Sequence, residues 1–160
     1  MVIVSDLMTK DVITLDINDP IKKLLKVMSA HNVSCVVITR AEKPVGLITE
    51  RDLIKKILLP GKDSKTLKLK DIMAKTLIGI DPKVDLGKAS QTLEQKKIRH
   101  LPVIDGDKLV GLITQTDIVS QTQTIHKKNK NFMMYQNIQT AVIVIFFLYV
   151  IIYFAFKFLF

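Results

Sequence analysis

Alternating hydrophobic and polar segments divide the first part of the chain into short elements. An apolar run at 12–15 indicates a strand. Asp19 and Pro20 then favour a helix start, because Asp is a good N-cap and Pro suits the first helical position. The apolar positions that follow recur at the i, i+3, i+4 and i+7 spacing of a helix face. They are Ile21, Leu24, Leu25 and Met28.

Two further apolar runs and a second helical segment complete this unit. The runs at 35–39 and 45–48 predict strands joined by a tight turn. The segment 50–59 predicts a helix, which Pro60 and Gly61 end. The pattern therefore predicts the order β-α-β-β-α.

The same pattern returns 65 residues later. Residues 6–53 align on 71–118 without a gap and with thirteen identities, among them the four residues that begin at Gly46 and at Gly111. The second copy predicts strands at 78–80, 101–104 and 109–113 around a helix at 86–97. Each unit is too short to bury a good core alone, so we expect the two to pack on each other. The fold class that follows is α+β, with two β-α-β-β-α repeats related by a pseudo-twofold axis.

The C-terminal segment differs in character from both repeats. Residues 138–160 are 23 consecutive residues with one charge, Lys157. At about 1.5 Å per residue they would form roughly 35 Å of helix, enough to cross a hydrocarbon core of about 30 Å. The alternative is a buried core helix, which suits this bulky aromatic segment less well. The expected organisation is repeat 1 at 1–59, a linker at 60–70, repeat 2 at 71–120, a basic juxtamembrane stalk at 121–137 and one C-terminal transmembrane helix.

Charge predicts an orientation for this tail. Three lysines precede it, at Lys127, Lys128 and Lys130, and the positive-inside rule then places the N-terminal domain in the cytoplasm. No signal peptide is expected, because the N-terminus lacks a basic segment followed by an apolar one. The sequence therefore predicts a single-pass, tail-anchored membrane protein.

Charge and aromatic content limit the classes of partner that we expect. The 24 Lys and Arg against 15 Asp and Glu give a net charge of +9, which suits an anionic partner such as a nucleotide, a nucleic acid or a lipid headgroup. All ten aromatic residues lie between Phe132 and Phe160, so residues 1–131 cannot stack a base on a ring. The single Cys35 lies in an apolar run, which favours a buried thiol and a reducing compartment.

One four-residue pattern stands at each junction of a strand and a helix. Thr49 precedes Asp52 by three residues, and Thr114 precedes Asp117 in the same way. This spacing is typical of a capping box, yet a carboxylate at a helix start can also accept hydrogen bonds from a vicinal diol such as ribose. Both roles stay open. The glycine three residues before each Thr, inside a predicted strand, indicates that a backbone or a ligand approaches closely there.

These residues carry a family resemblance. The repeated unit ends in Gly-Leu-Ile-Thr-x-x-Asp, it opens with Asp-(Leu or Ile)-Met, and Ile98-Arg99-His100-Leu101-Pro102 precedes the second hairpin. In these features residues 1 to about 120 resemble the tandem cystathionine-β-synthase (CBS) domain pair. The resemblance implies a regulatory module with two clefts between the repeats that bind adenosine nucleotides or S-adenosylmethionine, commonly in a homodimer.

The resemblance also implies site residues. The family's ribose-binding Asp falls on Asp52 and Asp117, beside Thr49 and Thr114. Each cleft is completed by the first strand and the second-strand entrance of the other repeat. The expected neighbours of Thr114 and Asp117 are Ile13, Val33 and Ser34, and those of Thr49 and Asp52 are Ile78, Ile98 and Arg99.

The two implied clefts are unequal. Arg99 and His100 stand where the family often places phosphate-facing basic side chains, whereas repeat 1 has Ser34 and Cys35 there. A phosphorylated ligand should therefore prefer the Arg99 cleft. For His100 a core or hairpin role is an equal alternative. Repeat 1 also has Val37 where repeat 2 has the family's usual Pro102, which makes its strand edge uncertain.

No catalytic or metal-binding pattern is present in the sequence, so we expect a protein that is not an enzyme and has no cofactor beyond a regulatory nucleotide. The leading hypothesis is a membrane-anchored adenine-nucleotide sensor that signals to a membrane partner. The alternative is a ligand-free CBS association or scaffold module in which Thr and Asp serve only as caps. Nucleic-acid binding is disfavoured, because acidic residues are interleaved with the lysines.

Overall fold

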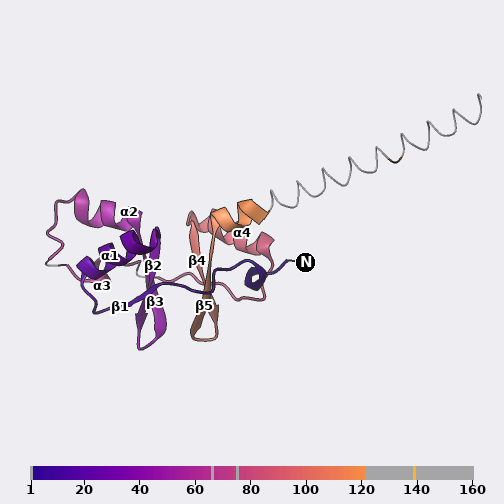
Figure 1. Ribbon diagram of the computed structural model, residues 1–160, viewed down its shortest axis with the longest axis horizontal. Coiled ribbons are helices and arrows are strands. Elements are labelled where there is room, and N and C mark those ends of the chain that lie inside the picture. The colour runs from indigo at the N-terminus through magenta and orange to yellow at the C-terminus, as the bar shows by residue number, and fades with distance from the viewer. Residues whose placement is uncertain (1, 66, 75, 122–138, 140–160) are drawn as a thin grey trace, which may run out of the picture. The chain divides into compact units, whose positions relative to one another are not determined.

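The computed structural model describes residues 2–65, 67–74, 76–121 and 139 (Figure 1). The chain divides into two compact units, Met1–Ile118 and Val119–Phe160. Apart from Gln121 and Gln139, the predicted stalk and transmembrane helix lie outside the described residues. Within the described ranges, no helix has the length and the apolar character needed to cross a membrane.

The first repeat forms a three-stranded sheet with helices packed against it. Its strands are β1 (Thr14–Asp16), β2 (Cys35–Arg40) and β3 (Lys43–Thr49). β1 pairs parallel to β2, and β2 pairs antiparallel to β3. Helix α1 (Ile21–His31) connects β1 to β2 and turns Ile21, Leu24 and Met28 inward, as the spacing predicts, whereas the fourth predicted position, Leu25, is 43% exposed.

Two local predictions in this repeat need correction. Pro20 itself is the N-cap of α1, because Asp19 turns its carboxylate back to accept a hydrogen bond from Asp16 N at 3.0 Å. The helix predicted at 50–59 starts as α2 (Glu50–Leu53) but continues as the π-helical turn η2 (Ile54–Leu58). In that turn Leu59 N bonds to Ile54 O, five residues back.

The second repeat has the same order of elements, except for the first strand. It contains α4 (Leu86–Lys96), β4 (His100–Asp105) and β5 (Lys108–Thr114), and residues 115–121 are helical. The Asp85 side chain caps α4 by accepting from Lys88 N at 3.0 Å. β4 and β5 pair antiparallel, with a register shift at the same place as in β2 and β3. From α4 onward the second repeat therefore has the predicted order α-β-β-α, whereas the first repeat has the full order β-α-β-β-α.

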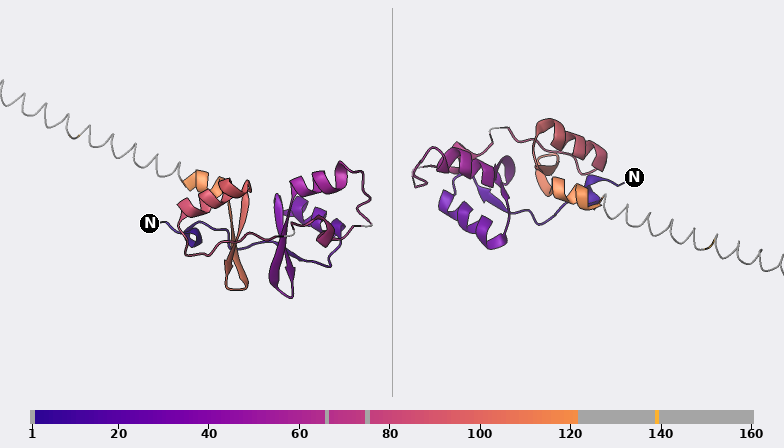
Figure 2. Two further views of the ribbon diagram at one scale, coloured as in Figure 1. Left: turned by 180° about the vertical axis from the view of Figure 1, so that it is seen from behind. Right: turned by 90° about the horizontal axis from the view of Figure 1, so that it is seen from above.

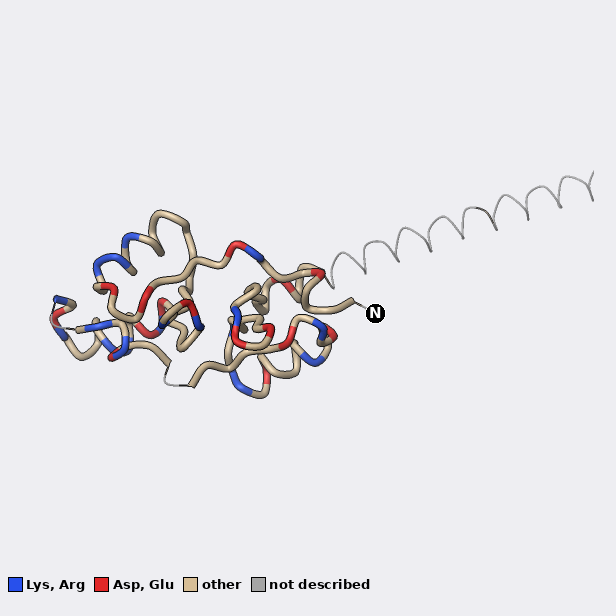
Figure 3. The backbone as a smooth tube through the Cα atoms, turned by 90° about the horizontal axis from the view of Figure 1, so that it is seen from below, with Lys and Arg blue, Asp and Glu red and all other residues tan. Residues whose placement is uncertain are grey.

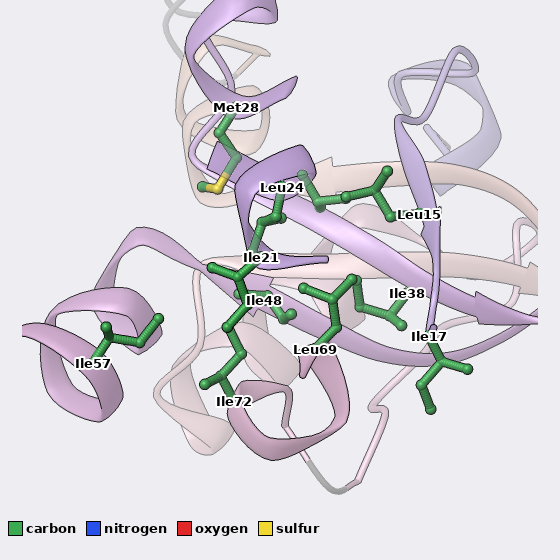
Figure 4. Packing of buried hydrophobic residues seen from close by; sticks show 11 residues of the cluster. Leu15, Ile17, Ile21, Leu24, Met28, Ile38, Ile48, Ile57, Leu69 and Ile72 are labelled. Atoms are coloured by element: carbon green, nitrogen blue, oxygen red, sulfur yellow. The ribbon is translucent and has the colours of Figure 1, made fainter. Parts of the chain in front are cut away.

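Each core takes a short segment from the other repeat. The 3-10 helix η1 (Val4–Asp6) packs Val4 into the core of the second repeat, and Val4 N bonds to Val84 O at 2.8 Å. In return, α3 (Leu69–Ile72) packs both its end residues into the core of the first repeat (Figure 4). We call the first repeat with α3 lobe 1, and the second repeat with η1 lobe 2.

The two hairpins lie side by side where the lobes meet. β3 and β5 are neighbours in every view, with α1 and α2 on the outer side of one hairpin and α4 on the outer side of the other (Figures 1 and 2). Ala74 N bonds to Leu47 O, and Thr9 N bonds to Leu112 O. The segments that follow α3 and η1 therefore pair with β3 and β5.

The buried strand glycines have a structural explanation. A Cβ atom at Gly46 would lie 2.8 Å from Met73 Sδ, and one at Gly111 would lie 2.5 Å from Met8 Sδ. Both methionines belong to the exchanged segments. A close approach is thus found at both glycines, but the nearest group is a methionine side chain and not the backbone or ligand that the sequence predicts.

Two prolines explain why the two sheets differ: Pro102 replaces Val37, and Pro82 replaces Ile17, whose N donates to Thr39 O at 2.9 Å in lobe 1. In lobe 1, Val37 N donates to Ile13 O at 3.3 Å, and β1 forms a full strand. Pro102 holds the equivalent place in lobe 2 and has no N–H to donate. The strand predicted at 78–80 is accordingly reduced to an isolated bridge between Ile80 and Val103.

Candidate functional site

The two Thr-x-x-Asp pairs stand at the ends of β3 and β5, where each strand turns into a helix. Asp52 Oδ2 accepts hydrogen bonds from Thr49 N at 3.0 Å and from Thr49 Oγ1 at 2.7 Å. Asp52 N in turn donates to Thr49 Oγ1 at 3.3 Å. The capping-box interpretation is therefore confirmed in repeat 1.

Repeat 2 builds the same box with nearly the same lengths. Asp117 Oδ2 accepts from Thr114 N at 2.8 Å and from Thr114 Oγ1 at 2.7 Å, and Asp117 N donates to Thr114 Oγ1 at 3.2 Å. Both aspartates are half-buried. In each pair the box occupies one carboxylate oxygen, Oδ2, and leaves Oδ1 outside it.

The second oxygen of Asp52 is engaged by a lysine. Lys56 Nζ lies 2.9 Å from Asp52 Oδ1 and 2.6 Å from Ile72 O, at the end of α3. Burial acts to raise the pKa of Asp52, but hydrogen bonds from Lys56 and Thr49 outweigh it and hold that pKa below its usual value. Gln121 is the residue at the equivalent position of repeat 2, four residues after Asp117.

Ser34 and His100 connect the two lobes. Ser34 Oγ lies 3.0 Å from His100 Nε2, although the two residues are 66 positions apart in sequence. His100 is also the strand partner of Thr114. Glu50 N donates to Ser34 O at 3.1 Å, and Gln115 N donates to Arg99 O at 3.0 Å. The two strand entrances and the starts of both following helices are therefore joined by direct contacts.

The electrostatic surroundings of His100 come from both repeats. Burial lowers the pKa of this imidazole, and the neighbouring Arg99 lowers it further. Glu50 from one repeat and Asp117 from the other act to raise that pKa. His100 therefore lies within the field of both helix starts, in a setting that favours the neutral ring.

The other predicted site residues fall into two groups. Arg99 and Ser34 are exposed. The four apolar residues are half-buried and pack against the core of their own lobe: Ile13 and Val33 in lobe 1, Ile78 and Ile98 in lobe 2. Their assignment to particular ligand clefts stays a prediction.

Cys35 is buried, as its apolar surroundings predict, and burial raises its pKa to about 12. Its sulfur is therefore a protonated thiol at neutral pH, which is a poor nucleophile. Among the described residues, no group of three or more His, Cys, Asp and Glu side chains is placed to hold a metal ion.

Two features of the site were not expected from the sequence. Lys56 was overlooked, although its i+4 spacing from Asp52 was a usable signal. The second is an ion pair of 2.6 Å between Lys43 Nζ and Asp107 Oδ2, which joins the turns of the two hairpins. No local pattern marks that pair, because its residues are 64 positions apart.

Comparison with known proteins shows the family of the chain. The model of the family described as "CBS domain" matches residues 4–59 and 69–122. The CBS domain-containing protein YhcV of Bacillus subtilis is 31% identical over 115 residues, which cover 72% of this chain and 81% of that protein.

Two solved structures share the fold. The CBS domain pair of protein MJ0100, in complex with 5′-methylthioadenosine and S-adenosyl-L-methionine, has a TM-score of 0.70 and 26% identity, covering 77% of this chain and 97% of that one. A hexameric CBS-CP12 protein from bloom-forming cyanobacteria has a TM-score of 0.71 and 28% identity, covering 79% of this chain and 75% of that one.

Proposed function

The chain belongs to the CBS domain family, and from that premise we propose that it is a regulatory module that binds an adenosine-containing ligand beside Asp52 and Asp117. The observation that carries the proposal is the position of these two carboxylates. Each is fixed by a capping box at the end of a hairpin strand, and each presents its Oδ1 side away from the box. The complex of the MJ0100 domain pair with adenosyl compounds supports this ligand class.

The surroundings suit a polar ligand that contains a ribose. Carboxylate oxygens accept hydrogen bonds from hydroxyl groups, and such charge-assisted bonds are stronger than neutral ones. Apolar groups from Ile13, Val33, Ile78 and Ile98 would provide contacts for the adenine, in a part of the chain without aromatic rings. Arg99 is exposed and available for a phosphate. Small proteins built from CBS domains are regulatory, so we assign no reaction to this one.

We propose further that residues 138–160 anchor the module in a membrane with the repeats in the cytoplasm. The support is the 23-residue apolar run and the lysines that precede it. In that arrangement the module would signal ligand binding to a membrane protein partner. Oligomers occur in the family, as the hexameric relative illustrates, and a homodimer is our proposal for this chain.

Nucleic acid is not favoured as a partner. Lys and Arg segments alternate with Asp and Glu segments over both lobes (Figure 3). A nucleic-acid surface requires a continuous basic patch to displace counterions along the phosphate backbone. Interleaved acidic residues weaken such a patch.

The proposal is tested by binding to the full chain in mild detergent. Calorimetric titrations with AMP, ADP, ATP and S-adenosylmethionine should give saturable binding with at least one of them. A ligand at 100 times its dissociation constant should add about 2.7 kcal/mol, which raises the melting temperature by several degrees. Asp52→Ala and Asp117→Ala should reduce binding, and the exposed Asp11→Ala is the matched control.

A scaffold function is the second candidate, and the capping boxes favour it. Because Thr49 and Thr114 already occupy one oxygen of each aspartate, the caps alone account for both pairs. A scaffold would lose about 1 kcal/mol of stability on each Asp→Ala change. It would show no heat of binding and no thermal shift with any of the four compounds at millimolar concentration.

A further inference from the structure

The two aspartates differ in how much hydrogen-bonding capacity they keep. We propose that Lys56 sets the ligand preference of the module: its ammonium group restricts Asp52, so that a ribose diol binds chiefly at Asp117. This inference rests on the proposed function, since it names which of the two carboxylates takes the ribose. It is carried by an ion pair that only one of the two repeats contains.

Counting acceptor positions shows the difference. An ionised carboxylate offers about four lone-pair positions, two on each oxygen. At Asp52, Thr49 N and Thr49 Oγ1 use both positions of Oδ2, and Lys56 uses one of Oδ1. About one position is left for a ligand. A vicinal diol brings two O–H donors, so Asp52 can accept one hydroxyl in its present arrangement.

Asp117 keeps twice that capacity. Thr114 N and Thr114 Oγ1 use both positions of Oδ2, as in the other repeat. Within the part of the chain that the structure describes, no side chain donates to Asp117 Oδ1. About two positions are left, which match the two hydroxyl groups of a ribose.

Lys56 is held in place by more than the aspartate. Besides Asp52 Oδ1 at 2.9 Å, its Nζ donates to Ile72 O at 2.6 Å and approaches Met73 O at 3.4 Å. An ammonium group has three N–H donors, and these three acceptors match them. A diol that placed both hydroxyl groups on Asp52 would have to displace Lys56 from Oδ1, and Lys56 has no further donor for a phosphate.

Charge acts in the same direction. The Lys56 ammonium neutralises Asp52 locally, which weakens the attraction of this carboxylate for a hydroxyl proton. Gln121 stands at the equivalent position, four residues after Asp117 within the helical run 115–121, and carries no charge. Within the described ranges, no ion pair engages Asp117.

The test uses the full chain in mild detergent, with AMP, ATP and their 2′-deoxy counterparts as probes. The unchanged protein should show one strong site per chain, which Asp117→Asn removes and Asp52→Asn retains. Loss of the 2′-hydroxyl should weaken that site about 10- to 100-fold, the worth of one hydrogen bond to a charged group.

Two variants move the lysine between the repeats. Lys56→Gln should strengthen binding at Asp52 about tenfold, so that a second site becomes measurable, whereas the exposed neighbour Lys55→Gln should change nothing. Gln121→Lys should weaken the strong site about tenfold by placing an ammonium group four residues after Asp117. It leaves the contacts of Lys56 with α3 intact, so it remains informative if Lys56→Gln does not fold.

The possible results distinguish the inference about Lys56 from the proposed nucleotide binding on which it rests. Equal affinities at the two aspartates, or a strong site removed by Asp52→Asn, would overturn the inference and leave the nucleotide function standing. The same holds if Gln121→Lys leaves the strong site unchanged. Absence of binding by every probe to every folded variant would overturn both.

Discussion

Lobe 1 and lobe 2 are built from one repeated pattern, yet they differ at their edges and around their aspartates. Lobe 1 has a three-stranded sheet, whereas lobe 2 has a two-stranded sheet and only the bridge Ile80–Val103 in place of the first strand. Lobe 1 has a lysine bound to its aspartate, and lobe 2 has Gln121 in that place. The elements common to both lobes share an apolar pattern more than identical residues, since β2 and β4 have no identity in the alignment.

The comparison shows that the spacing shared by the two repeats determines their common elements. Isolated substitutions determine where the two lobes differ. Pro102 and Pro82 stand where lobe 1 has Val37 and Ile17, and the two missing N–H groups shorten the first strand of lobe 2. Cys35 and His100 are equivalent as well, but one is a buried thiol and the other bonds across to Ser34. Neither Pro102 nor His100 disturbs the hairpin that carries it.

The largest loss of stability is expected from substitutions in the two segments that the lobes exchange. Leu69 and Val4 are equivalent residues, both 0% exposed, and each lies in the core of the opposite repeat. Leu69→Ala should cost about 2–5 kcal/mol. Val4→Ala should cost about 2 kcal/mol, since it removes fewer buried methyl groups.

Hydrogen exchange reveals where each change acts. Leu69→Ala should speed exchange of the β2 and β3 amides, although Leu69 belongs to the second repeat in sequence. Val4→Ala should speed exchange in β4 and β5. If Leu69→Ala instead affected β4 and β5 alone, the reciprocal packing would be wrong.

The next largest loss of stability is expected when a side chain is added at Gly111, which lies in close contact with Met8. Gly111→Val would force side-chain atoms against Met8 Sδ and Met8 Cγ, which lie 2.5 Å and 2.8 Å from an ideal Cβ at this glycine. Overpacking of this kind costs about 1–3 kcal/mol. The measurement is the urea midpoint of the variant.

A second substitution should relieve this strain. Met8→Ala in the Gly111→Val background should recover part of the lost stability, so that the double-mutant cycle is not additive. Strict additivity would place the strain elsewhere.

A smaller effect is expected when the lobe 2 strand edge is copied into lobe 1. Val37→Pro removes the hydrogen bond from Val37 N to Ile13 O. The expected cost is about 1 kcal/mol, the usual net value of one hydrogen bond. Thermal unfolding measures it, with Val37→Ala, which keeps the N–H and its bond to Ile13 O, as the comparison that isolates the loss of the side chain.

The smallest expected change is a pH dependence specific to lobe 2. The pKa of His100 lies below its ordinary 6.5 in the folded protein, because burial and Arg99 disfavour the imidazolium. As the pH falls through 6.5 the unfolded chain takes up this proton first, so stability is present above that pH and decreases below it. Urea midpoints at pH 7.5 and 5.5 should differ less in His100→Gln than in the unchanged protein.

His31 provides the control for that measurement, because it is an exposed histidine at the end of α1. His31→Gln should leave the pH dependence as it was. An equal reduction in both variants would show that His100 is not the group responsible.

The repeated elements and the capping boxes could be predicted from the sequence, because both depend on local spacing. The apolar residues at 21, 24 and 28 specify a helix face, and Thr49 and Asp52 meet through three-residue spacing alone. Local spacing does not predict the π-helical turn η2. Its hydrogen-bond register depends on tertiary contacts of Ile57 and Lys56.

The exchange of η1 and α3 between the lobes could not be predicted from the sequence either. Val4 and Leu69 are recognisable as apolar, but hydrophobicity does not specify which of two similar cores a residue joins. The buried glycines came closest to revealing the exchange. They indicated a close approach, and only the structure identifies Met8 and Met73 as the approaching groups.

The reciprocal exchange also orders the events of synthesis. Residues 14–72 contain everything that the core of lobe 1 needs, so this lobe can close while the second repeat is still being made. Lobe 2 joins Val4 to strands that end at Thr114, so it must close a loop of nearly the whole folded region. Contacts of such sequence separation form slowly. The earliest residues of the chain are therefore among the last to reach their native place.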